Sequence, residues 1–402
     1  MKIVSRINKS IKILSLTAAL GVSFALPALA LDGDAFFARV QAEMKKGGGA
    51  IEAGKITVDG TTVKIIDAKI ISKDDPNSEK GIAKEIIFEN VEEDKDGGYL
   101  VGRTFVDEMK LEARENSDMV TTLHGLEMTK LLLKSEKNDA AYEGQLPYGT
   151  ISLKKMVAEE KGKPVLNLDD LSFGFSEYDP EKFIKFSGEI GNLRVDVSSL
   201  PNSEQKETFT KMGFNNIEIQ GNYKFDANLV DGHVDVALQG NMNEAGQLNI
   251  TIGLGGLTKD LANELIRLSN QAKSTSDKDQ QIAAMSIIGL LQQLSLNSID
   301  IKFVDNSITN KIIDLQKEPN EKREDFVAKI KMIVPFGLAQ LQHPDFAEKV
   351  STEIGKYLDN PENIEITAKP DHSTPFAVIT STAVTSRKDL IDLLKLDVKA
   401  NQ

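Results

Sequence analysis

The sequence predicts an α+β protein built on a long, mostly antiparallel, meandering β-sheet, with amphipathic helices packed on it and concentrated in the C-terminal half. Three observations lead to this class. Runs of alternating apolar and polar residues recur along the chain, Asp-Gly turn signals separate some of them, and helical periodicity becomes common only in the second half. A period of two places one set of side chains on one face of a sheet, so most of the chain reads as strands.

The clearest alternation lies between Asn216 and Leu257. Asp231-Gly232 predicts a two-residue hairpin there, and Asn243 to Gly246 predicts a longer turn. We therefore expect a three-stranded antiparallel meander with one apolar and one polar face. The alternating apolar positions are Ile217, Ile219, Gly221, Tyr223, Phe225, Ala227 and Leu229, then Val234, Val236, Leu238, Gly240 and Met242, and then Leu248, Ile250, Ile252 and Leu254.

An apolar sheet face needs a cover, which can be helices, a second sheet or a ligand. Helices of the second half could supply an ordinary packed core. Alternatively, a curved sheet could hold a lipid or an apolar peptide on this face. The candidate ligand-binding residues are Ile217, Ile219, Tyr223, Phe225, Val234, Val236, Leu238, Ile250 and Ile252.

Residues 31–200 form the strand-rich N-terminal part. An amphipathic helix is expected from Gly33 to Lys46, and Gly47-Gly48-Gly49 ends it. The strands that follow are long and their turns are polar, which is typical of an antiparallel meander rather than of βαβ units. These strands are expected at Lys55–Val58, Thr61–Ile71, Lys84–Val91, Tyr99–Ala113, Val120–Leu133, Gly149–Val157, Val165–Phe175 and Phe183–Val197.

Residues 201–402 mix helices and strands, and one continuous sheet could cross the soft boundary near Pro201. Helices are expected at Ser203–Met212, Lys259–Ala272, Lys278–Leu294, Phe326–Met332 with an end near Pro335, Asp345–Leu358 and Arg387–Leu394. Four of them precede similar strands, namely Asn216–Ile219, Ser298–Ile301, Asn363–Ile366 and Lys395–Val398. Their unequal spacing excludes a solenoid, but leaves open a loosely duplicated unit or ordinary strand periodicity.

Residues 1–30 read as a cleaved secretory signal peptide. A basic start, the apolar run Ile13 to Pro27 and the small-residue site Ala28-Leu29-Ala30 follow one another. No later run approaches the roughly 18 apolar residues of a membrane-spanning helix. We therefore expect an exported protein, periplasmic in a bacterium with two membranes, and no transmembrane segment after cleavage.

Composition excludes several classes of function. The chain has no Cys, so cysteine-based zinc sites and thiol redox chemistry are excluded. Its formal charge is −13, and loss of the four cations of residues 1–30 lowers this to −17. Such a charge argues against nucleic acid or anionic lipid surfaces as non-specific partners. Trp is absent, which makes a sugar-stacking platform a poor fit.

Motifs for catalysis, metals and cofactors fail on inspection. The histidines at 124, 233, 343 and 372 show no metal spacing. The acidic turn Glu92 to Gly98 resembles the start of a calcium loop, but Arg103 stands where the final Glu belongs. We expect no catalytic residue, no metal and no cofactor. A hydrolase with a dispersed site that uses His124 or His233 is the enzymatic alternative.

The segment Lys55-Ile56-Thr57-Val58-Asp59-Gly60-Thr61-Thr62-Val63 resembles the strand-and-turn units of AsmA-like envelope proteins. This resemblance implies a periplasmic, non-catalytic role in lipid handling or envelope maintenance. Our hypothesis is therefore an exported protein that binds an apolar ligand such as a lipid, or an envelope protein partner. The alternative is a structural or interaction protein whose core is filled.

Overall fold

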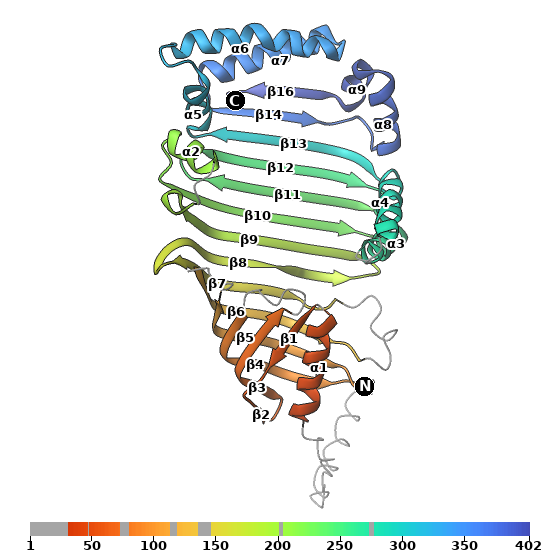
Figure 1. Cartoon of the computed structure of the whole chain (residues 1–402). Helices are drawn as coiled ribbons and strands as arrows, with labels where there is room; N and C mark the ends of the chain where they lie inside the picture. The colour runs from red at the N-terminus through yellow and green to blue at the C-terminus, as the bar shows by residue number, and fades with distance from the viewer. Residues whose placement is uncertain are drawn as a thin grey trace, which may run out of the picture.

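The computed structural model describes residues 31–46, 48–72, 80–112, 119–135, 146–200, 204–272 and 277–402. These residues form an antiparallel 16-stranded sheet bordered by helices, most of which lie in the C-terminal half (Figure 1). The predicted fold class is confirmed. The predicted signal peptide, residues 1–30, lies outside the described residues, as do the predicted boundary positions Gly47, Ala113, Pro201 and Ser203.

The sheet is a meander in which nearly every strand pairs with its neighbours in sequence. β2 pairs only with β3 and the short β15 pairs only with β13, while the main path ends β13-β14-β16. The strands are β1 (Gly49–Glu52), β2 (Lys55–Asp59), β3 (Thr62–Ser72), β4 (Lys80–Glu93), β5 (Tyr99–Glu112), β6 (Met119–Leu133), β7 (Thr150–Glu160), β8 (Lys163–Asp179), β9 (Phe183–Asp196), β10 (Asn216–Asn228), β11 (His233–Met242), β12 (Gly246–Gly255), β13 (Ser295–Asp305), β14 (Asn363–Ala368), β15 (Thr374–Pro375) and β16 (Leu396–Ala400).

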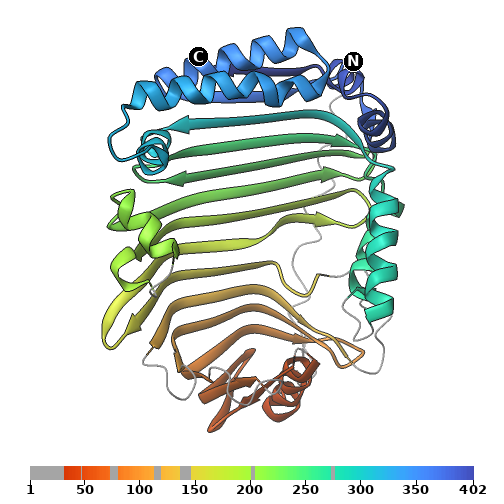
Figure 2. The same cartoon turned by 45° about the horizontal axis from the view of Figure 1, so that its top comes forward.

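The sheet runs without a break from the N-terminal to the C-terminal part, because β9 pairs with β10 over most of its length. The strand direction turns gradually between β3–β6 and β8–β14, as Figures 1 and 2 show. Such a twist is the ordinary consequence of right-handed strand geometry accumulating over many strands.

Apart from α1 (Gly33–Lys46), which packs on the face of the first strands, the helices lie along the borders of this sheet and form no second continuous layer (Figure 2). The other helices are α2 (Glu204–Lys211), α3 (Lys259–Gln271), α4 (Asp277–Leu291), α5 (Ile308–Gln316), α6 (Arg323–Leu338), α7 (Pro344–Asp359), α8 (Phe376–Thr385) and α9 (Arg387–Leu394). None of the helices in the described part of the chain is long and apolar enough to cross a membrane.

Two helices were not predicted from the sequence. α8 contains several β-branched residues and no charge, a composition that favours strands. α5 begins three residues after β13, at Ser307 and Ile308, so its apolar positions read as a continuation of the strand pattern. Tertiary packing overrides weak local preference in both cases.

The predicted end of a helix near Pro335 is wrong. α6 continues through Pro335 to Leu338, and the amide of Ala339 donates a hydrogen bond to the Pro335 carbonyl at its end. Proline removes one helical hydrogen bond and favours a kink, but it does not force termination. α6 packs along α7.

The predicted two-residue hairpin at Asp231-Gly232 is also wrong, because four residues separate β10 from β11. Leu229 leaves the ladder and its amide donates a 2.7 Å hydrogen bond to the Lys182 carbonyl in the neighbouring β8–β9 connection. Gly232 takes a positive φ of 77°, which a glycine adopts without strain. A bond to another connection, invisible in a local pattern, therefore widens this turn.

Candidate functional site: an uncovered apolar trough

A single row of directly paired residues crosses the apolar face of the sheet. Each member lies opposite the next on the neighbouring strand, so all of them project from the same face. We call this the central row: Val63, Phe88, Thr104, Met128, Ile151, Phe173, Gly188, Tyr223, Leu238, Ile250, Ile301, Ile366 and Val398.

Helix α1 covers the beginning of this row. Phe36 is fully buried there and meets Phe88 and Tyr99 edge to face, with ring centroids 5.1 and 5.2 Å away. Val63 and Phe88 of the central row are 0% and 3% exposed as a result. The N-terminal part of the sheet therefore has an ordinary hydrophobic core beneath α1.

In the second half, helices α2 to α5, α8 and α9 cover the two ends of the strands, while α7 packs along β16 at the edge of the sheet. At one end α3 and α4 bury Ala227 and Val234, and α8 and α9 pack nearby on Leu296 and Ala368. At the other end α2 and the start of α5 pack on Val197, Ile217 and Ala245. Figure 1 shows these two groups of helices at opposite ends of the strands. These two groups of helices rise beside the apolar face at the two ends of its strands. We call the helices the walls and the apolar face between them the floor.

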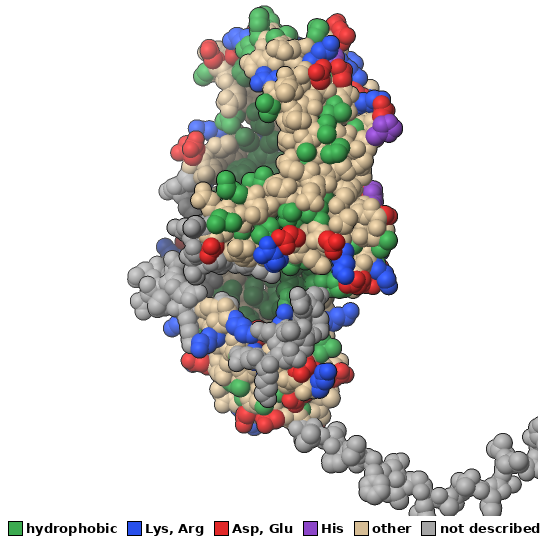
Figure 3. Space-filling view, turned by 90° about the vertical axis from the view of Figure 1, so that its right-hand side faces the viewer, with side chains coloured by type: hydrophobic (Ala, Val, Ile, Leu, Met, Phe, Trp, Pro, Cys, Tyr) green, Lys and Arg blue, Asp and Glu red, His purple; other side chains and the backbone are tan. Residues whose placement is uncertain are grey.

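The middle of the floor between β8 and β14 has no such cover. Among the described residues, Phe173, Tyr223, Leu238, Ile250, Ile301 and Ile366 belong to none of the four packed clusters. Leu238 is 38% and Ile366 43% exposed, although both lie on interior strands. We call this uncovered middle the trough. Figure 3 shows hollows whose walls are lined by hydrophobic side chains.

Gly240 provides an independent measure of this open space. It lies on the apolar face of β11, one alternation away from Leu238, and a Cβ added to it would meet no atom within 4 Å. A glycine in the interior strand of a closed core would meet close-packed neighbours. The space directly above Gly240 is therefore not filled by any residue that the structure describes.

The nine candidate residues from the sequence share this face, but they divide into two groups. Tyr223, Leu238 and Ile250 lie on the trough floor. The others lie under or beside the walls, where α2, α3, α4 or α8 pack, and these are Ile217, Ile219, Phe225, Val234, Val236 and Ile252. Sequence reasoning missed Phe173, Ile301 and Ile366 as floor residues, although their strands carry the same alternation.

An aromatic chain crosses the floor at β8 to β10. Phe186 lies edge to face with Phe175 at 5.2 Å and with Tyr223 at 6.2 Å, and Phe175 contacts Tyr178 at 5.7 Å. A cavity of about 410 Å³ opens beside Phe175 and Tyr178, with Lys130 at its lining. Burial raises the pKa of the Tyr223 phenol, so this group stays protonated as a hydrogen-bond donor.

The opposite face of the sheet is polar and its groups are paired with one another. Arg103 bridges Glu89 and Glu127 on the two adjacent strands, at 3.0 and 2.9 Å. These hydrogen bonds, led by the one to Glu127, raise the pKa of Arg103. Arg194 donates to Asp169 at 2.6 Å. Cross-strand ion pairs of this kind are typical of a face that is in contact with solvent. The trough on the other face is therefore the better candidate for a functional site.

Among the residues that it describes, the structure does not bring His124 or His233 together with other groups into a hydrolase active site. His124 and His233 are each about half exposed, 3.7 Å from Glu108 and 3.2 Å from Asp235 respectively. Both project from the polar face, since Leu123 and Val234 beside them project from the other. Within the described residues, no group of three or more His, Asp or Glu could hold a metal ion. Asp94 accepts hydrogen bonds from the amides of Asp96 and Gly98, as an acidic turn does.

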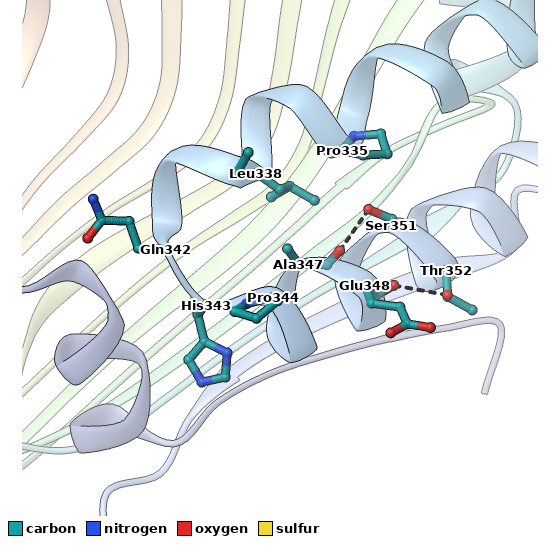
Figure 4. A pocket seen from close by; sticks show the side chains of 10 residues that line it. Pro335, Leu338, Gln342, His343, Pro344, Ala347, Glu348, Ser351 and Thr352 are labelled. Carbon is teal, nitrogen blue, oxygen red and sulfur yellow. Dashed lines mark hydrogen bonds between the residues drawn. The ribbon is translucent and has the colours of Figure 1, made fainter.

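A second cavity, of about 710 Å³, lies between α6 and α7 (Figure 4). The Ser351 and Thr352 hydroxyls there donate to carbonyls of the preceding turn, those of Ala347 and Glu348. His343 accepts from the Phe346 amide through Nδ1 and contacts Asp392 through Nε2 at 3.1 Å. These polar groups already form hydrogen bonds within the protein. We therefore interpret this cavity as a gap between the two helices rather than as a binding site.

Comparison with known proteins adds a limited result. No curated protein matches the chain. Residues 239–401, from the end of β11 to the C-terminus of the sheet, match a family model described as "Uncharacterized protein".

Proposed function

We propose that this protein is an exported, non-catalytic lipid-binding protein that holds acyl chains in the trough. The uncovered floor between β8 and β14 carries this proposal. Leu238 and Ile366 project from interior strands into space that no described residue fills. Apolar side chains exposed on neighbouring interior strands are typical of a ligand or partner site.

The dimensions of the trough suit lipid. Six strand-to-strand steps separate β8 from β14. At about 4.8 Å per step they span roughly 29 Å. A bilayer hydrocarbon core, in which two acyl chains meet end to end, is about 30 Å thick. The floor therefore has the length of two acyl chains in line, and its aliphatic and aromatic side chains provide no specific polar recognition along most of it.

Tyr223 supplies a polar group at one point on this floor. Its protonated phenol could donate a hydrogen bond to an ester or carboxylate oxygen of a lipid. Lys130 beside Tyr178 adds a positive charge near the aromatic end of the floor. These two groups support an orientation with the lipid head group toward β7–β10 and the acyl chains toward β14.

The proposal is tested by lipid analysis of the protein purified without detergent. Native mass spectrometry and lipid extraction should show co-purifying lipid. A Leu238→Asp variant should retain at least about tenfold less, because a charge on the floor opposes acyl-chain burial. Ala237→Asp is the matched control, since the neighbouring residue of β11 projects from the polar face.

Equal lipid content in Leu238→Asp and Ala237→Asp, or no lipid in the wild type together with no uptake of added fatty acid, would count against lipid binding in the trough.

The exported location is tested separately, by determining the N-terminal residue of the protein recovered from the producing cell. We expect Leu31 at that position. The resemblance of residues 55–63 to AsmA-like units supports an envelope setting for such a protein.

A further inference from the structure

Helices α4 and α8 expose apolar side chains on the outer side of one trough wall. In α4 these are Ile282, Met285 and Ile288, at intervals of three residues, and Met285 is 69% exposed. Such spacing gathers side chains on one side of a helix. In α8 they are Val378 and Val384, of which Val384 is 88% exposed. Side chains of this size rarely gather on a solvated surface without a partner.

This surface is uncharged in a strongly acidic chain. No charged residue occurs from Gln280 to Leu294 or from Ser373 to Ser386, although 27% of all residues are charged. Figure 3 views the molecule from the side that carries α3, α4, α8 and α9. In that view the upper part of the molecule is mostly uncharged, with scattered hydrophobic side chains, and a band of charged side chains crosses the surface below it.

The two helices are joined and belong to the trough wall. The Phe376 amide donates to the Leu294 carbonyl at 2.9 Å, and Thr380 Oγ1 lies 3.1 Å from Gln292 Oε1. On the inner side, Leu290 of α4 and Phe376 of α8 pack against the end of the apolar face. The outer surface is therefore continuous, through these helices, with the wall of the trough.

Most of the hydroxyl groups on both helices are already bonded within the helix. Ser286 donates to the Ile282 carbonyl at 2.9 Å, Ser381 to Val378 at 3.0 Å and Thr385 to Ser381 at 3.0 Å. A hydroxyl satisfied in this way costs less to transfer from water into an apolar medium. This arrangement suits contact with hydrocarbon, which offers no hydrogen bonds in return.

We propose that the outer surface of α4 and α8 docks onto the surface of a lipid bilayer. We favour a bilayer over a protein partner because this surface exposes aliphatic residues and methionine, carries no charge, and presents hydroxyls that are bonded within their own helices, so it offers a partner little polar recognition. Docking here brings one wall of the trough against a membrane. The inference stands independently of what the trough holds, since the outer surface could dock whether the floor is loaded or empty.

Flotation of the protein with phosphatidylcholine vesicles tests this docking. The wild type should float with the vesicles, and added salt should leave its binding unchanged because no charge contributes. A Met285→Glu and Ile288→Glu double variant should bind about tenfold more weakly or worse, since two charges face the hydrocarbon. Thermal unfolding of both proteins verifies that the variant remains folded.

Ile312→Glu is the matched control. Ile312 is 44% exposed on α5, which lies at the opposite ends of the strands. Its variant should float like the wild type. Failure of the wild type to float, or equal loss in the Ile312→Glu variant, would overturn the proposal. Dimer dissociation in the double variant without any vesicle binding would instead assign the surface to a second copy of the chain.

The trough variant Leu238→Asp separates the two proposals. It should lose co-purifying lipid but keep its flotation, because Leu238 lies on the floor and not on the outer surface of the wall. If the double variant at Met285 and Ile288 loses flotation while its lipid content is normal, docking and lipid binding are distinct properties of two surfaces.

Discussion

Gly221 and Gly240 lie directly opposite each other on β10 and β11, yet their surroundings differ. A Cβ added to Gly221 would come within 2.9 Å of the Gln239 carbonyl oxygen, whereas one added to Gly240 would meet nothing within 4 Å. The register of β10 shifts between Ile219 and Gly221, which turns Gly221 toward its neighbour's backbone. Gly240 faces the open trough.

A Gly240→Leu substitution should fill the trough without damaging the fold. Its side chain enters empty space and replaces a weak strand residue, so the free energy of unfolding should change by no more than about 1 kcal/mol. Lipid retention should fall about tenfold, because the new side chain occupies the volume of an acyl chain. Urea unfolding and lipid extraction measure the two effects, and a marked loss of stability would show that protein already fills this space.

Gly221→Ala should destabilise the protein, in contrast to Gly240→Ala. The methyl group meets backbone rather than a flexible side chain, and overpacking of this kind costs about 1–3 kcal/mol. The Gly240→Ala variant is the cross-strand control and should unfold at the wild-type urea concentration or slightly above it. Identical unfolding midpoints for the two alanine variants would refute this reading of the register shift.

Phe36→Ala should be the most damaging single truncation in α1. The ring is fully buried between Phe88 and Tyr99, and removing a buried Phe costs about 3–5 kcal/mol. Phe37→Ala, at the neighbouring and only partly buried position, should cost less. Hydrogen exchange should show the loss of protection first in β3–β5, beneath α1. Uniform loss across all strands would indicate that the sheet unfolds as one cooperative unit.

Stability should fall with acid partly through Glu353. Its carboxylate accepts hydrogen bonds from Lys356 at 2.6 Å and from the buried amide of Ala400 at 2.8 Å, which links α7 to β16. The Lys356 contact, with the Ala400 amide, lowers the pKa of Glu353 below its ordinary value near 4.5. The stabilisation is therefore complete above about pH 4.5 and disappears as the pH falls through the lowered pKa.

Glu353→Gln should therefore unfold more easily at pH 7, by about 1–3 kcal/mol, because a hydrogen bond to a charged group is lost. Its unfolding free energy should also depend less on pH below about 4.5 than that of the wild type, because the lowered pKa of Glu353 makes the wild type lose stability there. Glu348→Gln, on an exposed face of the same helix, is the control. Parallel acid dependence in all three proteins would exclude Glu353 as a contributor.

Most of the secondary structure of this protein could be predicted from the local sequence pattern. Strand alternation from Thr61 onward, the helix from Gly33 to Lys46 and the helix-then-strand order of the second half all follow from periodicity, and each agrees with the structure. The errors have identifiable causes. α8 was missed because its β-branched residues favour a strand, and α6 passes Pro335 because proline favours a kink without forcing a helix to end.

The apolar floor could also be predicted from the sequence, since alternation alone places Tyr223, Leu238 and Ile250 on one face. The number of strands over which this floor extends could not be predicted in this way. The central row joins residues as distant in sequence as Phe173 and Ile366, and only the register of each strand pair brings them into line. A shift of one residue in any pair would send the next strand's apolar residues to the polar face.

The amino-acid sequence alone thus defines an antiparallel sheet with one apolar face, because side-chain alternation is a local property of each strand. Whether that face is a filled core or an open trough depends on where the helices lie. Their amphipathic patterns predict that they pack on something apolar, but not where along the strands they do so. Tertiary structure places α1 over the row at Phe88, α7 along β16, and most of the other helices at the strand ends, so that Leu238 and Ile366 stay partly exposed among the described residues.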